Sequence, residues 1–472
     1  MANFLITTPN SLTEGTDTAD LFELRTGAGV SIVAAAGADI VSASSNVFTA
    51  ANLQAGAGDD EINFSVSGVL LDNAVIQLGA GNDVVDVIDG ARAGASSARG
   101  GLDITGGGGD DDIIIRSGAN FGGGTSINGN AGSDQIFIDP DVTLTNSLVA
   151  GGGDSDDIFA NNGINFSSSS LNGGGGADFI TVSGTVSNSF IQADNLNDTQ
   201  FFGDDLVLIE GNFGSGSTVI GGGGNDLIDV GADFTTGGST VNGNDGNDEI
   251  LINAFAGSGG TFVGGGAGVD TITVSTLADN FGTIQGGGGV DSITVSALAF
   301  NGGFIFGGDA ADTIGLGEIL SGAGGAAASG VNVGYASFSE STLGSVDVIS
   351  ADSTGQSGGA ASFVISQDVT NFSVVAFSGN GVTGNAAGQA VFSGVADTLT
   401  ARATLLDATL VNGNAVTFTA GGSTYLFVQG GAAGSGTSGD LLVQLNGDAA
   451  AGVVAATGSI ARVSNSQLKV NF

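Results

Sequence analysis

Hydrophobic and polar residues alternate in two short runs per repeat along the first 320 residues, one run on each side of a glycine-rich turn. After the turn, aliphatic residues stand two positions apart, as at Ile228 and Val230 or at Ile293 and Val295. Alternation with period two is typical of a β-strand with one buried face. Before the next turn a second run carries one aliphatic residue that we expect to point inward: Ile127, Leu171, Ile220, Val241, Val263, Ile284 and Ile305. The pattern predicts coils of strand, corner, strand and glycine turn, with inward side chains stacked into ladders.

The turn repeats roughly every 22 residues and ends in an aspartate. Its clearest copies read GGGGADFI at 173–180, GGGGNDLI at 221–228 and GGGGVDSI at 286–293. The aligned aspartates are Asp60, Asp83, Asp111, Asp134, Asp156, Asp178, Asp226, Asp248, Asp270, Asp291 and Asp312, with decayed copies at Asp20, Asp39 and Asp205. Because each repeat of such an array needs only its neighbours for a core, we expect an all-β fold. The fold would be a parallel β-roll or β-solenoid.

Two further features concern corners and loops. A phenylalanine often marks the corner opposite the aspartate turn, and we interpret the series as an aromatic edge of the core: Phe121, Phe166, Phe213, Phe234, Phe255, Phe281 and Phe300. Insertions at 88–103 and 191–205 lengthen two coils and should form loops. Three of the seven basic residues, Arg92, Arg99 and Arg116, lie in or near the first insertion. They either dock on an acidic neighbour or belong to a solvated loop.

The repeat and its disappearance divide the chain into four segments. Residues 1–19 are a short N-terminal lead or cap, residues 20–318 the solenoid, and residues 319–360 a Gly-, Ala- and Ser-rich cap and linker. Residues 361–472 lack the glycine turn and alternate as β-strands do, with one helix-like stretch at 395–410. We expect a small β-rich C-terminal domain there.

Composition excludes several classes of function. Seven basic residues against 48 acidic ones give a net charge of −41, which argues against binding to nucleic acid. The chain has no Cys and no His, so zinc sites lose their usual ligands and Ser-His-Asp catalysis is impossible. With 88 Gly but only 2 Pro, the chain is not collagen-like. So large a charge opposes a compact state unless bound cations or high salt offset it.

The glycine turn resembles the G-G-x-G-x-D-x-U-x nonapeptide of the calcium-binding repeats-in-toxin (RTX) family, whose repeats form a parallel β-roll. The likeness extends over about residues 14–318. It implies calcium bound between successive turns, with carboxylate ligands from Asp60, Asp83, Asp111, Asp134, Asp156, Asp178, Asp226, Asp248, Asp270, Asp291 and Asp312. Family rolls carry the motif on both edges, whereas here one edge carries it, so we expect one column of Ca²⁺ ions. The alternative is that the turns are tight corners without ions.

A second resemblance lies near the C-terminus. Residues 423–445, STYLFVQGGAAGSGTSGDLLVQL, are similar to the end domain of RTX proteins that are exported by type I secretion, crystalline surface-layer proteins among them. The resemblance implies an uncleaved C-terminal export signal, in agreement with an N-terminus that lacks a basic and apolar signal-peptide pattern. No run of about 18 apolar residues is present, so membrane insertion is not expected.

These observations lead us to expect a secreted, calcium-binding structural protein of the cell surface. It would fold on Ca²⁺ outside the cell and assemble with itself into a surface layer or extracellular matrix. The alternative is a calcium-dependent adhesin or a polysaccharide-binding module. We do not expect an enzyme, because decayed repeats begin near Asp20 and leave no room for a preceding catalytic domain.

Overall fold

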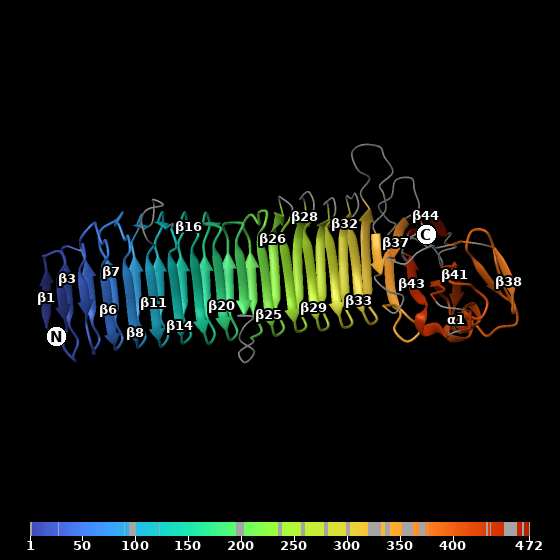
Figure 1. Cartoon of the computed structure of the whole chain (residues 1–472), viewed down its shortest axis with the longest axis horizontal. Helices are drawn as coiled ribbons and strands as arrows, with labels where there is room; N and C mark the ends of the chain where they lie inside the picture. The colour runs from blue at the N-terminus through green and yellow to red at the C-terminus, as the bar shows by residue number, and fades with distance from the viewer. Residues whose placement is uncertain are drawn as a thin grey trace, which may run out of the picture. The chain divides into compact units, whose positions relative to one another are not determined.

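The computed structural model describes residues 2–26, 28–88, 90–93, 101–121, 123–194, 203–234, 238–255, 260–277, 282–298, 303–319, 332–335, 340–351, 362–367, 373–374, 376–430, 433–434, 436–447, 460–464 and 467–471. They form two compact units, unit 1 with Met1–Thr235 and Ser239–Gly243, and unit 2 with Thr236–Gly238 and Asn244–Phe472. Each unit contains stacked coils of parallel strands, so the expected all-β solenoid with a small antiparallel sheet near the C-terminus is confirmed (Figure 1).

In unit 1, the strand that follows each aspartate turn belongs to what we call the first sheet. Every strand in it pairs in parallel with the equivalent strand of the next coil, as β12 does with β15 through Ile113–Ile136 and Ile115–Ile138. The strands are β1 (Asn3–Ile6), β3 (Leu21–Leu24), β5 (Ile40–Ala43), β7 (Glu61–Phe64), β9 (Val84–Val87), β12 (Asp112–Ile115), β15 (Gln135–Ile138), β18 (Asp157–Ala160), β21 (Phe179–Val182), β24 (Leu206–Ile209) and β26 (Leu227–Phe234).

The strand that leads into the next glycine turn belongs to the second sheet. In unit 1 it contains β2 (Leu12–Glu14), β4 (Ser31–Val33), β6 (Asn52–Ala57), β8 (Val75–Ala80), β11 (Asp103–Gly108), β14 (Ser126–Ala131), β17 (Leu148–Gly153), β20 (Ser170–Gly175), β23 (Phe190–Asp194) and β25 (Thr218–Gly223). Five coils add a third, short strand between the two, which the sequence did not predict. They are β10 (Arg92–Ala93), β13 (Asn120–Phe121), β16 (Thr143–Thr145), β19 (Asn165–Ser167) and β22 (Thr185–Ser187).

Unit 2 contains the same two kinds of sheet, and its strands also pair in parallel. Its first-sheet strands are β28 (Glu249–Phe255), β30 (Thr271–Leu277), β32 (Ser292–Leu298), β34 (Thr313–Ile319) and β36 (Asp347–Ala351). Its second-sheet strands are β29 (Phe262–Ala267), β31 (Thr283–Gly288), β33 (Phe304–Asp309), β35 (Asn332–Tyr335) and β37 (Ser362–Gln367). β27 (Thr240–Asp245) lies where the units divide. The parallel pairing thus extends into the segment expected as a cap and linker.

Strands from later in the chain cover the last coil of unit 2. β43 (Leu441–Gly447) pairs with β36 in parallel, and β42 (Ser423–Val428) and β41 (Ala415–Ala420) follow it as antiparallel strands. β45 (Gln467–Asn471) pairs with β37 and with β44 (Ile460–Ser464). A separate antiparallel sheet holds β38 (Phe377–Gly379), β39 (Val382–Gly384) and β40 (Ala390–Phe392). The helix expected at 395–410 is confirmed as α1 (Leu399–Asp407), and a short 3₁₀ helix η1 spans Thr437–Gly439.

The core of both units is built from the aliphatic pairs that the alternation indicates. Ile113 and Ile115 are fully buried, and so are Ile293 and Val295 in unit 2. One assignment was wrong: Val219, not Ile220, points inward. The other residues of the predicted series lie seven positions before their aspartate, as Ile127 does before Asp134, and the equivalent position before Asp226 is 219. Since side chains alternate along a strand, an error of one residue places Ile220 on the outer face.

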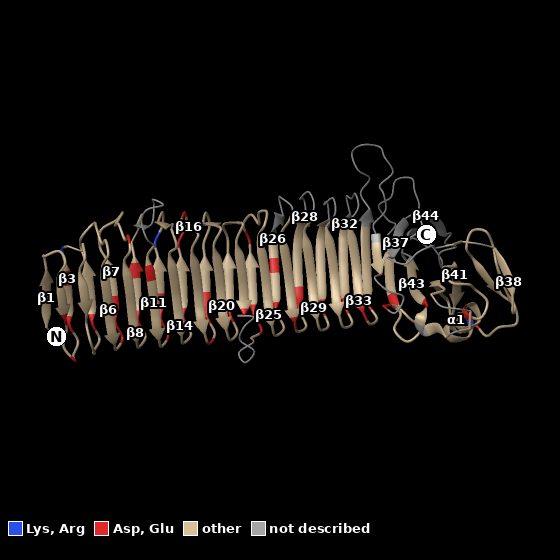
Figure 2. Ribbon diagram, viewed as in Figure 1, with Lys and Arg blue, Asp and Glu red and all other residues tan. Residues whose placement is uncertain are grey.

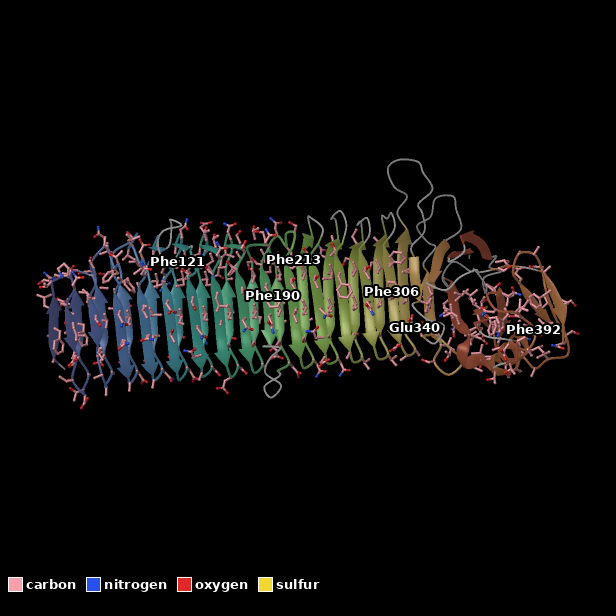
Figure 3. All side chains as sticks on the ribbon, viewed as in Figure 1. Phe121, Phe190, Phe213, Phe306, Glu340 and Phe392 are labelled. Carbon is pink, nitrogen blue, oxygen red and sulfur yellow. The ribbon has the colours of Figure 1, made fainter. Side chains whose placement is uncertain are left out.

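The aromatic corner is confirmed where the structure describes it. Phe121 and Phe213 are fully buried, and Phe166 is 3% exposed (Figure 3). The side chains of Phe234, Phe255, Phe281 and Phe300 lie outside the described residues. In unit 2 a second core forms where Ala403 and Leu406 of α1 pack against Val416, Phe418, Phe427 and Leu442. This cluster ties the helix to the antiparallel strands.

Candidate metal centre

The glycine turn brings the backbones of successive coils too close together for most side chains. In the coil that ends at Asp178, Gly174 has φ +129° and Gly176 has φ +110°, conformations that L-residues rarely adopt. A Cβ at Gly174 would overlap the Gly152 carbonyl oxygen of the preceding coil. Glycine is needed at these positions because the stacking of the turns leaves no room.

Each turn ends in an aspartate whose side chain is buried rather than exposed. The aligned aspartates are at most 2% exposed, including the decayed copies Asp20, Asp39 and Asp205 (Figure 2). Their carboxylates are linked into what we call the Asp ladder, because Oδ1 of each accepts the backbone N–H of the aspartate one coil earlier. In unit 1 the N–H of Asp134 donates to Asp156 at 2.7 Å, and that of Asp156 donates to Asp178 at 2.9 Å.

The Asp ladder is continuous within each unit. In unit 1 the hydrogen bonds run from Asp20 through Asp39, Asp60, Asp83, Asp111, Asp134, Asp156, Asp178 and Asp205 to Asp226. In unit 2 they run from Asp248 through Asp270, Asp291 and Asp312 to Asp347. The structure therefore brings every predicted ligand aspartate into a ladder. Asp347, an irregular copy outside the predicted set, adds a rung.

The glycine five residues before the aspartate makes room for the carboxylate. A Cβ at Gly151 would overlap Oδ2 of Asp156, and the same holds for Gly173 and Asp178 and for Gly286 and Asp291. A backbone carbonyl also lies near Gly151: the same Cβ would be 2.6 Å from the carbonyl oxygen of Gly173 in the following coil. The carboxylate oxygen and the carbonyl oxygen are thus close neighbours.

The second oxygen of these aspartates lacks a donor. Among the described residues, Oδ2 is buried without a hydrogen-bond partner in Asp39, Asp60, Asp83, Asp111, Asp134, Asp156, Asp178, Asp205, Asp270, Asp291, Asp312 and Asp347. A buried carboxylate oxygen without a donor is unfavourable unless a proton or a cation lies beside it. Carboxylate and carbonyl oxygens are the ligands that calcium prefers. The donor set therefore fits a hard divalent cation.

No larger acidic cluster forms, since within the described ranges no three acidic side chains come together as a metal group. A bound ion would accordingly combine ladder carboxylates with turn carbonyls. The acidic residues are distributed one rung per coil, in agreement with a column rather than a single compact site.

Burial raises the pKa of the ladder carboxyls because the charged form loses its hydration. The pKa of Asp134 rises to about 6, that of Asp111 to about 7, and that of Asp156 to about 8. Neighbouring carboxylates raise them further, whereas the backbone N–H bond lowers them. These groups titrate close to neutral pH, where a cation competes directly with protons for the same oxygens.

Asp20, the first rung, differs from the others. Burial raises its pKa, but hydrogen bonds to both of its oxygens outweigh burial and hold the pKa below the usual value. The Ala2 N–H donates to Oδ1 at 2.8 Å and the Thr16 N–H to Oδ2 at 2.7 Å. Asp20 therefore has a donor on each oxygen: the Ala2 N–H of the preceding coil on Oδ1, as in every ladder link, and the Thr16 N–H on Oδ2.

Two further ladders escaped prediction. The residue just before the aspartate accepts the N–H of the following coil, as Asp110 does from Ser133 at 2.9 Å and Asp204 does from Asn225 at 2.7 Å. These side chains are exposed. At another corner the Oγ of Ser169 is buried and accepts the N–H of Ser147 at 3.2 Å.

The insertions are only partly described, because residues 94–100 and 195–202 lie outside the described residues, Arg99 among them, as does the side chain of Arg92. Arg116 is described. Its guanidinium pairs with Asp86 at 2.8 Å and with Asp139 at 3.7 Å. The arginine joins neighbouring coils of its own unit.

Comparison with known proteins gives no relative: no protein-family model matches the chain, and no curated protein matches it. Within the part of the chain that the structure describes, no helix is both long and apolar enough to span a membrane. The function must therefore be argued from the ladder itself.

Substitutions at Gly106 and Gly108, two glycines of one turn, test whether the buried carboxylate needs the space beside it. A Cβ at Gly106 would overlap Asp111 Oδ2, so we expect Gly106→Ala to destabilise the fold by about 2 kcal/mol or more. Gly108 has nothing within 4 Å of the added Cβ, so Gly108→Ala should be neutral or slightly stabilising. Urea midpoints of the two variants measure the difference, and equal midpoints would contradict the buried carboxylate.

The raised pKa values predict how pH affects the metal-free protein. A group whose pKa is 3.8 in the unfolded chain and about 8 in the fold, such as Asp178, binds its proton more tightly when folded. Its stabilising contribution is complete at low pH and is lost as pH rises from 3.8 toward 8. With chelator present, we expect a lower melting temperature at pH 8 than at pH 5.

Monovalent salt provides the control for that measurement. Salt screens repulsion between exposed acids but acts weakly on buried ones, so most of the pH dependence should persist at high salt. A metal-free melting temperature that rises or stays constant between pH 5 and pH 8 would show that the ladder carboxyls are not buried.

Proposed function

We propose that this chain is a secreted structural protein of the RTX kind, which binds calcium along the Asp ladder and assembles at the cell surface. The proposal rests on one observation. The aspartate Oδ2 is buried, has no hydrogen-bond donor, and lies near a carbonyl oxygen of the glycine turn, as at Asp156 and Gly173. The same two oxygens recur along the ladder, so whatever compensates their negative charge must recur along the ladder too.

Two solutions are chemically available, a proton or a cation. A proton on each carboxyl suffices at acid pH, but pKa values of about 6 for Asp134 and about 7 for Asp111 leave such groups largely charged above neutral pH. Calcium, when bound, would supply the positive charge that these carboxylates need. The turn carbonyls complete a set of oxygen ligands that calcium accepts in flexible geometry.

The proposed ligands are the ladder aspartates of the predicted set together with carbonyls of the glycine turns. In unit 1, Asp111 would act with Gly129, Asp134 with Gly151, and Asp156 with Gly173. In unit 2, Asp270 would act with Gly286 and Asp291 with Gly307. Each pair joins a carboxylate of one coil to a carbonyl of the next, so an ion there would cross-link coils.

The hydrogen bonds at the corners support one column of calcium ions rather than two. The corner lined by buried serines already satisfies its polar atoms: the Ser147 hydroxyl donates to Thr145 at 3.1 Å, and the Ser189 hydroxyl donates to Ser187 at 2.9 Å. Neutral hydroxyls that are bonded in this way need no cation. The charge that requires compensation is confined to the aspartate edge.

Secretion and surface assembly rest on the sequence resemblances and on the coupling of folding to calcium. A chain of −41 charge would remain loose where calcium is scarce, and would fold where calcium is plentiful. The ladder sites lie in turns rather than in a catalytic cleft, in keeping with a structural role.

The alternative of polysaccharide binding finds less support on the first sheet. Phe137 and Phe159 line its outer face, with ring centroids 5.1 Å apart and planes 12° apart. Rings stacked in this way cover each other's faces, and those faces are the parts that a sugar ring would contact. We therefore propose no second function.

Replacing one rung tests the calcium proposal. In Asp156→Asn the amide oxygen can still accept the Asp134 N–H, while the amide nitrogen can donate toward the Gly173 carbonyl. Without calcium we expect this variant to be more stable than the native chain by about 1 kcal/mol. With calcium it should gain less stability than the native chain, because one rung has lost its charge.

Asp157→Asn is the matched control, since Asp157 is the next residue but lies half-buried on β18 outside the ladder. Calcium titrations followed by circular dichroism and melting temperature provide the readout. Native protein whose spectrum and melting are the same in chelator and in millimolar calcium would sink the proposal.

Assembly is tested by electron microscopy of the purified chain. We expect sheets or filaments in millimolar calcium, which chelator disperses, because cations reduce the repulsion between acidic surfaces. Stable monomers that bind glycans in a calcium-dependent way would instead favour the adhesin alternative.

A further inference from the structure

The residue five positions before a ladder aspartate points into the coil beside the carboxylate. Where it is glycine, the space in front of its Cα lies between two oxygens: a Cβ at Gly106 would be 2.3 Å from Asp111 Oδ2 and 2.5 Å from the Gly129 carbonyl oxygen. These are the two kinds of oxygen that the proposed function assigns to calcium. We call an aspartate open when a Cβ on this glycine would overlap its Oδ2. The open rungs are Asp111, Asp134, Asp156, Asp178 and Asp226 in unit 1 and Asp270, Asp291 and Asp312 in unit 2.

Several other coils carry a side chain at the same position. Leu78 lies five residues before Asp83, and β8 pairs with β11 in register on both sides of it, so Leu78 is the equivalent of Gly106. Leu78 is fully buried, as an inward residue must be. We call such aspartates filled. By the same spacing, Ala34 fills the position before Asp39 and Ala55 fills the position before Asp60, and both alanines are at most 1% exposed.

Two coils with extra residues between this position and the aspartate are filled as well. The pairing of β23 with β20 places Ala193 at the equivalent position in the coil of Asp205. The pairing of β35 with β33 places Tyr335 there in the coil of Asp347. Both side chains are buried, with Tyr335 only 2% exposed. The ladder therefore contains two kinds of rung, and the residue at one position distinguishes them.

A filled rung keeps the hydrogen bond of the ladder but loses the space for an ion. Oδ1 of Asp83 accepts the Asp60 N–H at 2.7 Å, within the range of the open rungs. The difference lies on the Oδ2 side, where the carbons of Leu78 take the place of an empty volume. Calcium needs six to eight oxygen ligands, and an apolar side chain supplies none and excludes water that could.

We propose that this position selects the rungs that take a cation, so that calcium binds at the open rungs and not at the filled ones. The inference rests on the proposed function and narrows its ligands, since Asp60 and Asp83 leave the predicted set. Leu78 is then a residue that determines where in the column an ion is absent. In unit 1 the coils of the filled rungs Asp39, Asp60 and Asp83 follow one another, so they would be held by apolar packing alone.

Native mass spectrometry of the full chain, at a calcium concentration that saturates it, counts the bound ions. We expect Asp156→Asn to hold one ion fewer than the native chain, because it removes the charge of an open rung. Asp83→Asn makes the same change at a filled rung and should hold as many ions as the native chain. Asp157→Asn removes one carboxylate outside the ladder, and it corrects for ions that exposed acids hold loosely.

A gain of binding provides the opposite test. Leu78→Gly opens the rung of Asp83 and should hold one ion more than the native chain. Leu78→Ala is the matched control, because it also removes buried carbons but keeps the Cβ, so its ion count should not rise. Both variants should melt at a lower temperature than the native chain in chelator, and calcium should recover more of that loss for Leu78→Gly.

The outcomes separate this inference from the proposal on which it rests. A native chain that holds no more calcium than its exposed acids explain would sink the proposed function itself. Calcium binding in which Asp83→Asn and Asp156→Asn lose the same number of ions would overturn the selection of rungs alone. A folded Leu78→Gly variant that gains no ion would do the same, and if that variant does not fold, the two asparagine variants decide.

Discussion

The structure depends on the burial of one carboxylate per coil. Only one of the two carboxylate oxygens has a hydrogen-bond donor there. The satisfied oxygen accepts a backbone N–H from the neighbouring coil, and this bond links the rungs, as between Asp134 and Asp156. The other oxygen needs space, which explains the glycine five residues earlier, and it needs a counter-charge, which the described residues do not provide. The glycines of the turn follow from this one requirement, and the proposed binding of cations would follow from it too.

The corners of the coils explain why this solenoid uses carboxylates in its turns. Parallel strands bond along their length, but a corner leaves backbone N–H groups that must find acceptors. This chain supplies them from side chains: Ser169 at one corner, Asp110 on the exposed side of the turn, and Asp156 on the buried side. Of these three, only Asp156 places a carboxyl group in the interior, where burial raises its pKa to about 8.

The sequence predicted the parts of this arrangement that repeat strongly. A fixed period aligned the aspartates, and alternation identified pairs such as Ile113 and Ile115 as core residues. It assigned Ile220 wrongly because Val219 and Ile220 are adjacent and equally apolar, so that only the distance to Asp226 separates them. The third sheet was missed because its strands have two or three residues, too few to show a period.

The buried serines were missed for a different reason. Ser147, Ser169 and Ser189 follow asparagine or serine in polar stretches that look like ordinary turns. A signal was present, since each stands two residues before an inward aliphatic residue such as Val149. The inward direction of the aspartates could not be read from the sequence either. A carboxylate beside glycines indicates an exposed turn unless the contact between Gly151 and Asp156 is known.

The two ends of the Asp ladder show how far a carboxylate can be satisfied without a counter-ion. Asp20 accepts the Ala2 N–H of the preceding coil on Oδ1, as other rungs do, but its Oδ2 accepts the Thr16 N–H as well. At the other end, the Asp347 N–H donates to the Ser341 hydroxyl at 2.9 Å, so the last N–H of the series needs no further carboxylate. An interior rung has no such option, because its neighbours on both sides are rungs that present the same groups. Electrostatic demand is therefore lowest at Asp20 and recurs at each interior rung whose Oδ2 has no donor. In the proposed function, cations would act at those interior rungs that face a glycine and would hold neighbouring coils together.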